Sequence, residues 1–101
     1  MEYSAIYKNT TIRLKERIKM FNKVSEVKPL EDMQLEVKFI SGETKIYDVK
    51  PLLEKFEVFK KLKNIDLFNK VKVDMDGYGI MWDEEVDLAC DELWYNGKTV
   101  G

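Results

Sequence analysis

Residues 33–49 read MQLEVKFISGETKIYDV, and this stretch decides the fold. Apolar and polar side chains alternate over residues 33–39, which is the period of a strand with one buried face. The residues predicted to share that face are Met33, Leu35, Val37 and Phe39. Ser41-Gly42 indicates a tight turn, because glycine accepts the positive φ that short hairpin loops require. Residues 44–49 then return as the partner strand, so the stretch predicts a β-hairpin.

A second hairpin is predicted over residues 71–82, VKVDMDGYGIMW. Val71, Val73 and Met75 alternate with polar residues, Asp76-Gly77 is a strong hairpin signal, and residues 79–82 form the returning strand. Between the two hairpins, proline suits the first turn of a helix over residues 51–63, and apolar residues form a stripe along it. The sequence therefore predicts an α+β fold in which one antiparallel sheet of two β-hairpins packs on a central helix.

The flanking segments complete the expected organisation. Residues 9–22 have the pattern of an amphipathic helix, and residues 24–30 that of an extended segment. The acidic residues at 83–85 suit the N-terminus of a short C-terminal helix that ends at Asn96-Gly97, since the helix dipole favours negative charge there. We expect a basic N-terminal helical extension over residues 1–22 and a single α+β domain over residues 23–101.

Composition removes several kinds of chemistry. The 101 residues include no histidine and one cysteine, so a Ser-His-Asp triad, a Cys-His pair, a His-ligated zinc and an internal disulfide cannot form. The five glycines do not fall in the frames of phosphate-binding loops. No apolar run has the length of a membrane span, and the N-terminus lacks the apolar core of a signal peptide. We expect a cytoplasmic protein that is not an enzyme, holds no cofactor or metal, and does not bind a membrane.

Two features still suggest chemistry. Asp74, Asp76, Gly79 and Glu85 match positions 1, 3, 6 and 12 of a calcium-binding loop. Against calcium, the fifth position is Tyr78 and the following residues have a strand pattern, so a solvated hairpin is the preferred interpretation. Cys90 could act as a redox nucleophile, but its neighbours are acidic and disfavour the thiolate. We therefore expect a structural thiol.

Charge is divided between the ends of the chain. Residues 1–23 hold six Lys and Arg against two acids, a net of +4, whereas residues 74–101 hold eight acids against one Lys, a net of −7. A basic segment of this kind could bind nucleic acid through phosphate neutralisation. Alternatively it is a helix packed on the domain with a solvated basic face, or a leader arising from a start upstream of Met20. The candidate partner surface comprises Arg13, Lys15, Arg17 and Lys19.

The order of several short motifs resembles the bacterial family of unknown function DUF2442 over roughly residues 24–95. The residues that carry the resemblance are Leu35-x-Val37-x-Phe39, Gly42, Asp48, Pro51, Phe59-x-x-Leu62, Leu67-Phe68, Val71-x-Val73-Asp74, Gly79, Trp82 and Asp87-Leu88. The resemblance implies a hairpin, a helix and further strands without an assigned enzymatic activity. Some members of that family carry a C-terminal helix-turn-helix, and some are encoded beside a second small protein, a layout resembling toxin–antitoxin pairs. We do not expect DNA binding through such a helix-turn-helix here, and segment 1–19 departs from the family pattern.

The resulting functional hypothesis is a non-catalytic protein-binding module of a bacterial cytoplasm, with a small protein partner or self-association. By resemblance, it would be the antitoxin-like or regulatory member of a two-gene pair. The alternative is a nucleic-acid-binding protein that acts through its basic N-terminal helix.

Overall fold

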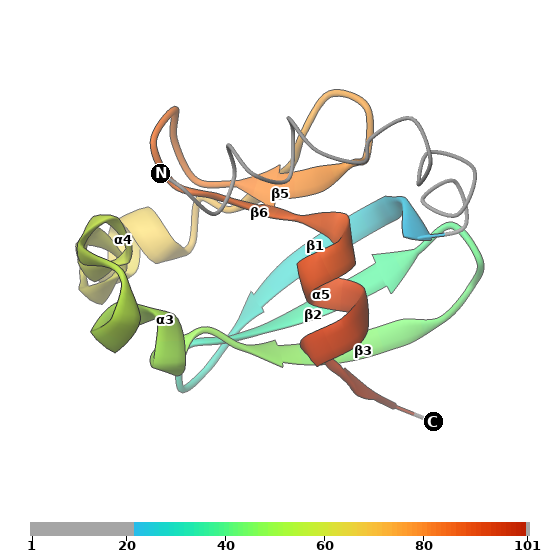
Figure 1. Cartoon of the computed structure of the whole chain (residues 1–101), viewed down its shortest axis with the longest axis horizontal. Coiled ribbons are helices and arrows are strands. Elements are labelled where there is room, and N and C mark those ends of the chain that lie inside the picture. The colour runs from blue at the N-terminus through green and yellow to red at the C-terminus, as the bar shows by residue number, and fades with distance from the viewer. Residues whose placement is uncertain (1–21, 101) are drawn as a thin grey trace.

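The structure is a computed structural model, and it describes residues 22–100. Within that range seven strands and several short helices form an α+β fold (Figure 1). In chain order the elements are β1 (Val24–Leu30), β2 (Gln34–Phe39), β3 (Thr44–Asp48), α3 (Lys50–Lys55), the 3₁₀ helix η1 (Glu57–Lys63), α4 (Ile65–Phe68), β4 (Lys72–Val73), β5 (Gly79–Met81), β6 (Asp87–Ala89), α5 (Cys90–Asn96) and β7 (Lys98–Thr99).

The first hairpin lies in a four-stranded antiparallel sheet of order β1-β2-β3-β7. Gly42 turns the chain with a φ of 97°, as the Ser41-Gly42 signal predicts. Leu35, Val37 and Phe39 are buried on one face, which confirms the predicted strand. Met33 differs, because it lies in the β1–β2 turn with a φ of 58° and is only half-buried. The extended segment over residues 24–30 is confirmed as β1.

The second hairpin belongs to a separate three-stranded sheet of order β4-β5-β6, so the expectation of one sheet made from both hairpins is wrong. A backbone hydrogen bond from Val24 N to Gly77 O, at 2.8 Å, joins the edges of the two sheets. The strands β4 and β5 have only two and three residues, and β5 pairs with β6 on its other side. The described pairings of β4, β5 and β6 are with one another, and none of them is with a strand of the longer sheet. Met75, assigned to a strand from its alternation, lies in the turn and is 94% exposed.

The predicted helix over residues 51–63 is divided in two. Phe56 has extended backbone angles, with φ −128° and ψ 124°, and separates α3 from η1. Phe56, Phe59 and Leu62 are three residues apart, and a 3₁₀ helix places side chains at that spacing above one another. Phe59 and Leu62 are fully buried there. The 3₁₀ form therefore places Phe59 and Leu62 on one inward face, and the half-buried Phe56 ring packs next to Phe59 with centroids 6.1 Å apart.

The acidic stretch at 83–85 does not begin a helix. The Asp83 carboxylate instead accepts hydrogen bonds from the backbone N–H groups of Glu85 and Val86, at 2.8 and 3.0 Å, and closes a turn. Strand β6 follows, and α5 starts only at Cys90. The helix was expected because a carboxylate can accept hydrogen bonds from two successive backbone N–H groups in a turn as readily as at a helix start. The predicted end of the helix at Asn96-Gly97 is confirmed.

Helix α5 lies across one face of the four-stranded sheet, while α3 and α4 lie together at the end of the sheet near the β1–β2 turn (Figure 1). Polar and aromatic contacts attach α5 to the sheet. The ring of Trp94 meets Phe39 edge-on at 5.0 Å, and the Tyr47 hydroxyl donates to Glu92 at 2.7 Å. The buried Lys45 donates from Nζ to the Trp94 carbonyl and lies 4.3 Å from the ring centroid. A cation at a helix C-terminus complements the dipole, so Lys45 closes α5.

Candidate functional site

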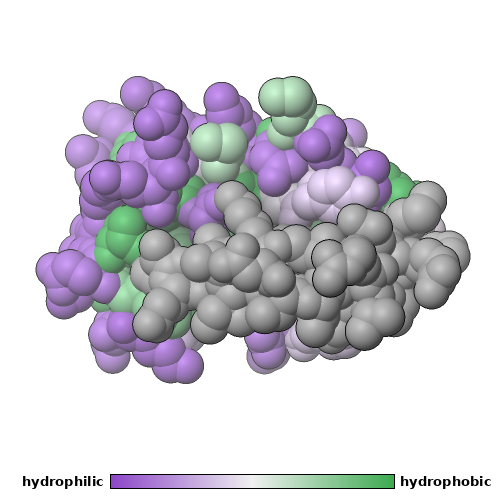
Figure 2. Space-filling model, turned by 45° about the horizontal axis from the view of Figure 1, so that its top comes forward, coloured by the Kyte–Doolittle hydropathy of each residue, from purple (hydrophilic) through white to green (hydrophobic). Residues whose placement is uncertain are grey.

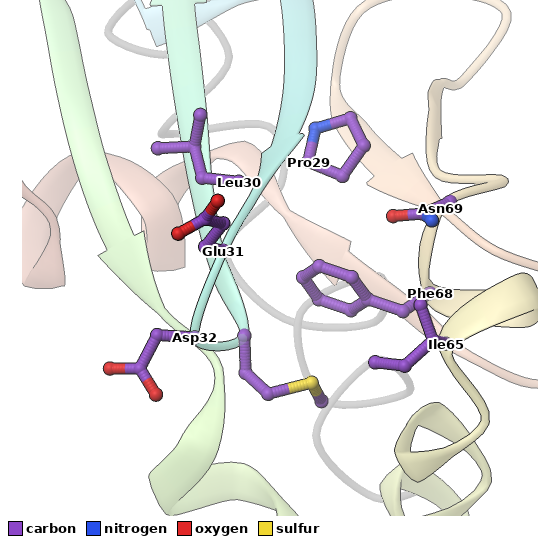
Figure 3. A pocket seen from close by; sticks show the side chains of 8 residues that line it. Pro29, Leu30, Glu31, Asp32, Ile65, Phe68 and Asn69 are labelled. Atoms are coloured by element: carbon purple, nitrogen blue, oxygen red, sulfur yellow. The ribbon is translucent and has the colours of Figure 1, made fainter.

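A groove of about 820 Å³ lies between the β1–β2 turn and α4 (Figure 3). Its lining joins segments that are more than thirty positions apart in the chain: Pro29, Leu30, Glu31, Asp32, Met33, Ile65, Phe68 and Asn69. In Figure 3 the side chains of Ile65, Phe68 and Asn69 point toward the turn, and Pro29 lies opposite them. This volume falls in the range of sites that hold small molecules or the side chains of a partner.

The turn that forms one side of the groove has an uncommon backbone. Asp32 and Met33 have φ values of 61° and 58°, a region that residues other than glycine rarely adopt. Lys50 holds this turn by donating from Nζ to the Asp32 carbonyl at 2.8 Å and to its carboxylate at 3.0 Å. The backbone N–H of Val49 donates to the Met33 carbonyl at 3.0 Å. Non-glycine residues in this region concentrate at functional sites, where surrounding contacts maintain them.

The opposite side is rigid because Phe68 is anchored in the core. Its ring is 1% exposed and stacks on Trp82 with centroids 6.3 Å apart. The Trp82 indole N–H donates to the Phe68 carbonyl at 3.0 Å. The Asn64 side chain caps α4 by accepting from the backbone N–H groups of Asp66 and Leu67. Ile65, the first residue of α4, is 56% exposed beside this anchored ring.

The charged side chains of the β1–β2 turn, Glu31 and Asp32, are both acidic. The Asp32 carboxylate points away from the groove in Figure 3 and pairs with Lys50 at 3.0 Å. Hydrogen bonds with Asp32 and then Asp48 raise the pKa of Lys50 above its ordinary value. Glu31 is exposed, and within residues 22–100 neither its side chain nor that of Asn69 forms an ion pair or side-chain hydrogen bond. The groove therefore presents apolar side chains and the Asn69 amide, and the Glu31 carboxylate lies on the far side of the turn; neither polar group has a side-chain partner in the described part of the chain.

A second hollow of about 610 Å³ lies where η1 faces the turn before β6. Three of its charged groups already pair with one another, since Lys61 Nζ contacts Asp83 at 3.3 Å and Glu85 at 2.5 Å. Hydrogen bonding to Glu85 and then Asp83 raises the pKa of Lys61. The backbone N–H of Glu85, and after it Lys61, lowers the pKa of Asp83. Because these groups satisfy each other, the first groove is the better candidate for binding.

The residues singled out from the sequence take other places. The candidate surface of Arg13, Lys15, Arg17 and Lys19 and the predicted helix over residues 9–22 lie outside the described residues, apart from residue 22. Asp74 Oδ1 accepts from the backbone N–H groups of Asp76 and Tyr78, at 3.2 and 3.1 Å, as part of the hairpin turn. Within residues 22–100 no group of three or more acidic or Cys side chains is placed to hold a metal. Cys90 is buried, with its sulfur 4.0 Å from the Asp91 carboxylate.

The groove was missed in the sequence because its two sides are joined only by the fold. The alternation over residues 33–39 places Met33 on the buried face of a strand, and that assignment hides its position in the turn. A turn-forming acid at Asp32 directly before the strand is the signal that could have indicated the hairpin turn. No spacing rule connects that turn with α4.

Together the two antiparallel sheets, the broken helical segment and the groove define a small α+β domain. The chain belongs to the family described as protein of unknown function (DUF2442), whose model matches residues 24–99. The resemblance of the motif series is thereby confirmed. Within residues 22–100, none of the helices combines the length and the apolar character that a membrane crossing requires.

One solved structure shares the fold: the crystal structure of putative DNA binding protein NE0471 from Nitrosomonas europaea ATCC 19718. The TM-score is 0.57 at 21% sequence identity, and the likeness covers 62% of this chain and 41% of that chain. At this identity the likeness shows the fold alone. This chain therefore corresponds to less than half of the length of that protein. A search of the curated proteins finds no match.

Proposed function

We propose that this domain is a non-catalytic protein-binding module that acts in a bacterial cytoplasm. The observation that carries the proposal is the groove beside the strained β1–β2 turn, where apolar side chains remain partly accessible. Ile65 is 56% exposed in this groove, where a side chain of a partner could cover it together with Pro29 and Met33. The partner is a small protein or a second copy of this chain. By its family, this domain would be the antitoxin-like or regulatory member of a two-gene pair.

The surface supports a small contact area. Figure 2 shows that hydrophilic side chains cover most of the described part of the face it presents, with separated hydrophobic areas between them. Large exposed hydrophobic residues within residues 22–100 are few and dispersed: Ile40, Ile65, Met75, Tyr95 and Val100. Of these, Ile65 is the one that lines the groove. A surface of this kind suits a modest interface with a few dominant side chains.

The experiment is capture followed by reconstitution. The full chain is crosslinked in its native host, and the captured protein is then co-expressed with it and measured by sedimentation. A defined complex that is lost in Ile65→Ser supports the proposal. The matched control is Ile40→Ser, because Ile40 and Ile65 are 55% and 56% exposed but only Ile65 lines the groove.

The alternative function is nucleic-acid binding through the basic segment, which is favoured by the net charge of +4 over residues 1–23. Electrophoretic mobility of a short DNA duplex and an RNA hairpin, at two salt concentrations, distinguishes it. Salt-sensitive binding that is lost when Arg13, Lys15, Arg17 and Lys19 are replaced by Ser would replace the protein-binding proposal.

A further inference from the structure

We propose that the groove binds a segment of the partner protein in which an apolar side chain is followed by a cationic one. This inference rests on the proposed function, since it names the chemistry of the partner at that same site. The apolar side chain would lie between the β1–β2 turn and α4. The cationic side chain would reach Glu31 over the turn.

The apolar part follows from the lining. Pro29, Met33 and Ile65 supply accessible apolar surface to the groove above the buried Phe68 ring, and within residues 22–100 the lining contains no basic side chain. Burial of one further apolar side chain between the turn and α4 removes the exposed surface of Ile65 from water, which is favourable in proportion to the area covered. Asn69 points into the same space, and its amide can both donate to and accept from the backbone of a bound segment.

The cationic part follows from charge complementarity. Lys50 pairs with Asp32 at 3.0 Å and also with Asp48 at 3.2 Å, whereas Glu31 is the acid of the groove lining that has no ion pair within residues 22–100. Figure 3 places Glu31 on the turn next to Leu30, on the other side from Phe68. A neighbouring residue in the bound segment must therefore cross the turn, and a long Lys or Arg side chain has that reach. Such a contact selects the partner more than it strengthens binding.

Addition of a strand to the sheet is the competing mode, and β1 is unsuited to it at this end. Pro29 has no backbone N–H, so an added strand would lack one of its ladder hydrogen bonds. Proline at this position is typical of an edge strand that does not pair further. Recognition through side chains is therefore favoured here over recognition through the backbone.

The test uses the full chain and three capped hexapeptide probes that share Gly and Ser flanks. Their central pairs are Leu-Arg, Ser-Arg and Leu-Glu, and binding is followed by NMR shifts of the Ile65 methyl groups. We expect saturable shifts with Leu-Arg, at least tenfold weaker binding with Ser-Arg, and about fivefold weaker binding with Leu-Glu, which corresponds to an exposed ion pair. Equal shifts with all three probes, or none at Ile65, would overturn the inference.

A charge-reversal variant distinguishes a direct effect of the Glu31 charge from a loss of folding, because its preference among the probes should be inverted and not lost. Glu31→Lys should invert the preference so that Leu-Glu binds more tightly than Leu-Arg, whereas Glu54→Lys, at an exposed acid on α3 away from the groove, should leave it unchanged. An unaltered preference in Glu31→Lys overturns the cationic part.

The capture experiment separates the two proposals. If Ile65→Ser still holds the native partner, the groove inference fails and the protein-binding function stands. If the wild-type chain binds nucleic acid and no protein, both fail.

Discussion

The two glycine-centred hairpins of this domain differ in the length of their strands and in the surroundings of the turn glycine. In the first, strands of six and five residues flank Gly42, and a Cβ added at Gly42 would meet nothing within 4 Å. In the second, strands of two and three residues flank Gly77, where a Cβ would lie 3.0 Å from the Val24 carbonyl. The backbone at Gly42 is therefore set by the turn itself, whereas at Gly77 a close contact with a distant segment adds a second requirement for glycine.

The largest expected effect tests the core under the first hairpin. Phe39 is 1% exposed and packs on Trp94. Phe39→Ala should lower the free energy of unfolding by about 3–5 kcal/mol in urea titrations, because it leaves a cavity between the sheet and α5. Ile40→Ala, at the exposed neighbouring position, is the control and should change it by less than about 0.5 kcal/mol. A negligible loss at Phe39 would contradict the register of the sheet.

The next effect sharpens the difference between the hairpins. A Cβ at Gly79 would lie 2.3 Å from the Leu88 carbonyl, a backbone atom of β6 that cannot move alone. Gly79→Ala should therefore cost about 3 kcal/mol or more. Gly42→Ala meets only the strain of a φ of 97° and should cost about 1–2 kcal/mol. Thermal unfolding of both variants checks the order, and equal losses would remove the distinction drawn between the hairpins.

A smaller effect tests how α5 is attached to the first sheet. Tyr47→Phe removes the hydroxyl that donates to Glu92 at 2.7 Å while it keeps the ring. The free energy of unfolding should fall by about 1 kcal/mol. Tyr95→Phe is the matched control, because Tyr95 is 68% exposed on the same helix. Similar values for both variants would show that the bond to Glu92 does not stabilise α5.

The smallest expected effect is on the pH dependence of stability, and it concerns the turn before β6. The pKa of Asp83 is lowered from 3.8 by the Glu85 backbone N–H and by Lys61. The stability from this carboxylate is thus present above that value and is lost as the pH falls through the lower folded pKa. Asp83→Asn should therefore melt with a weaker dependence on pH in the acid range, by calorimetry, than the wild type. Asp66→Asn, at an exposed acid outside this turn, is the matched control for removal of one negative charge.

Residues with a strong local pattern were predicted correctly. Leu35, Val37 and Phe39 alternate, Gly42 needs a positive φ, and Asn96-Gly97 ends a helix, so each is determined by its neighbours in the chain. The break at Phe56 was not visible, because an apolar spacing of three or four fits an α-helix until burial of Phe59 and Leu62 selects the 3₁₀ form. Likewise, the acidic residues at 83–85 are compatible with either a turn or the start of a helix.

The separation into two sheets and the position of the groove could not be predicted from local sequence patterns. Whether the two hairpins share a sheet is decided by pairing between residues that are far apart in the chain. The contact of Val24 with Gly77, where the two sheets meet, is of this kind, and no periodicity encodes it. The groove needs Met33 in a left-handed conformation that Lys50 and Val49 maintain from outside the turn. The sequence-based candidate surface on residues 13–19 stays a prediction, since it lies outside residues 22–100.

The pairing of β7 with β3 affects the order in which the domain can be completed during synthesis. Lys98 and Thr99 pair with Ile46 and Lys45, and Lys45 also closes α5. Translation delivers residues at about 5–20 per second, so β3 leaves the ribosome seconds before its outer neighbour exists. Until residue 100 emerges, β3 has an unpaired edge and Lys45 lacks its helix. The nascent domain is therefore exposed to wrong strand pairing at that edge, and a folding helper acting there would protect it.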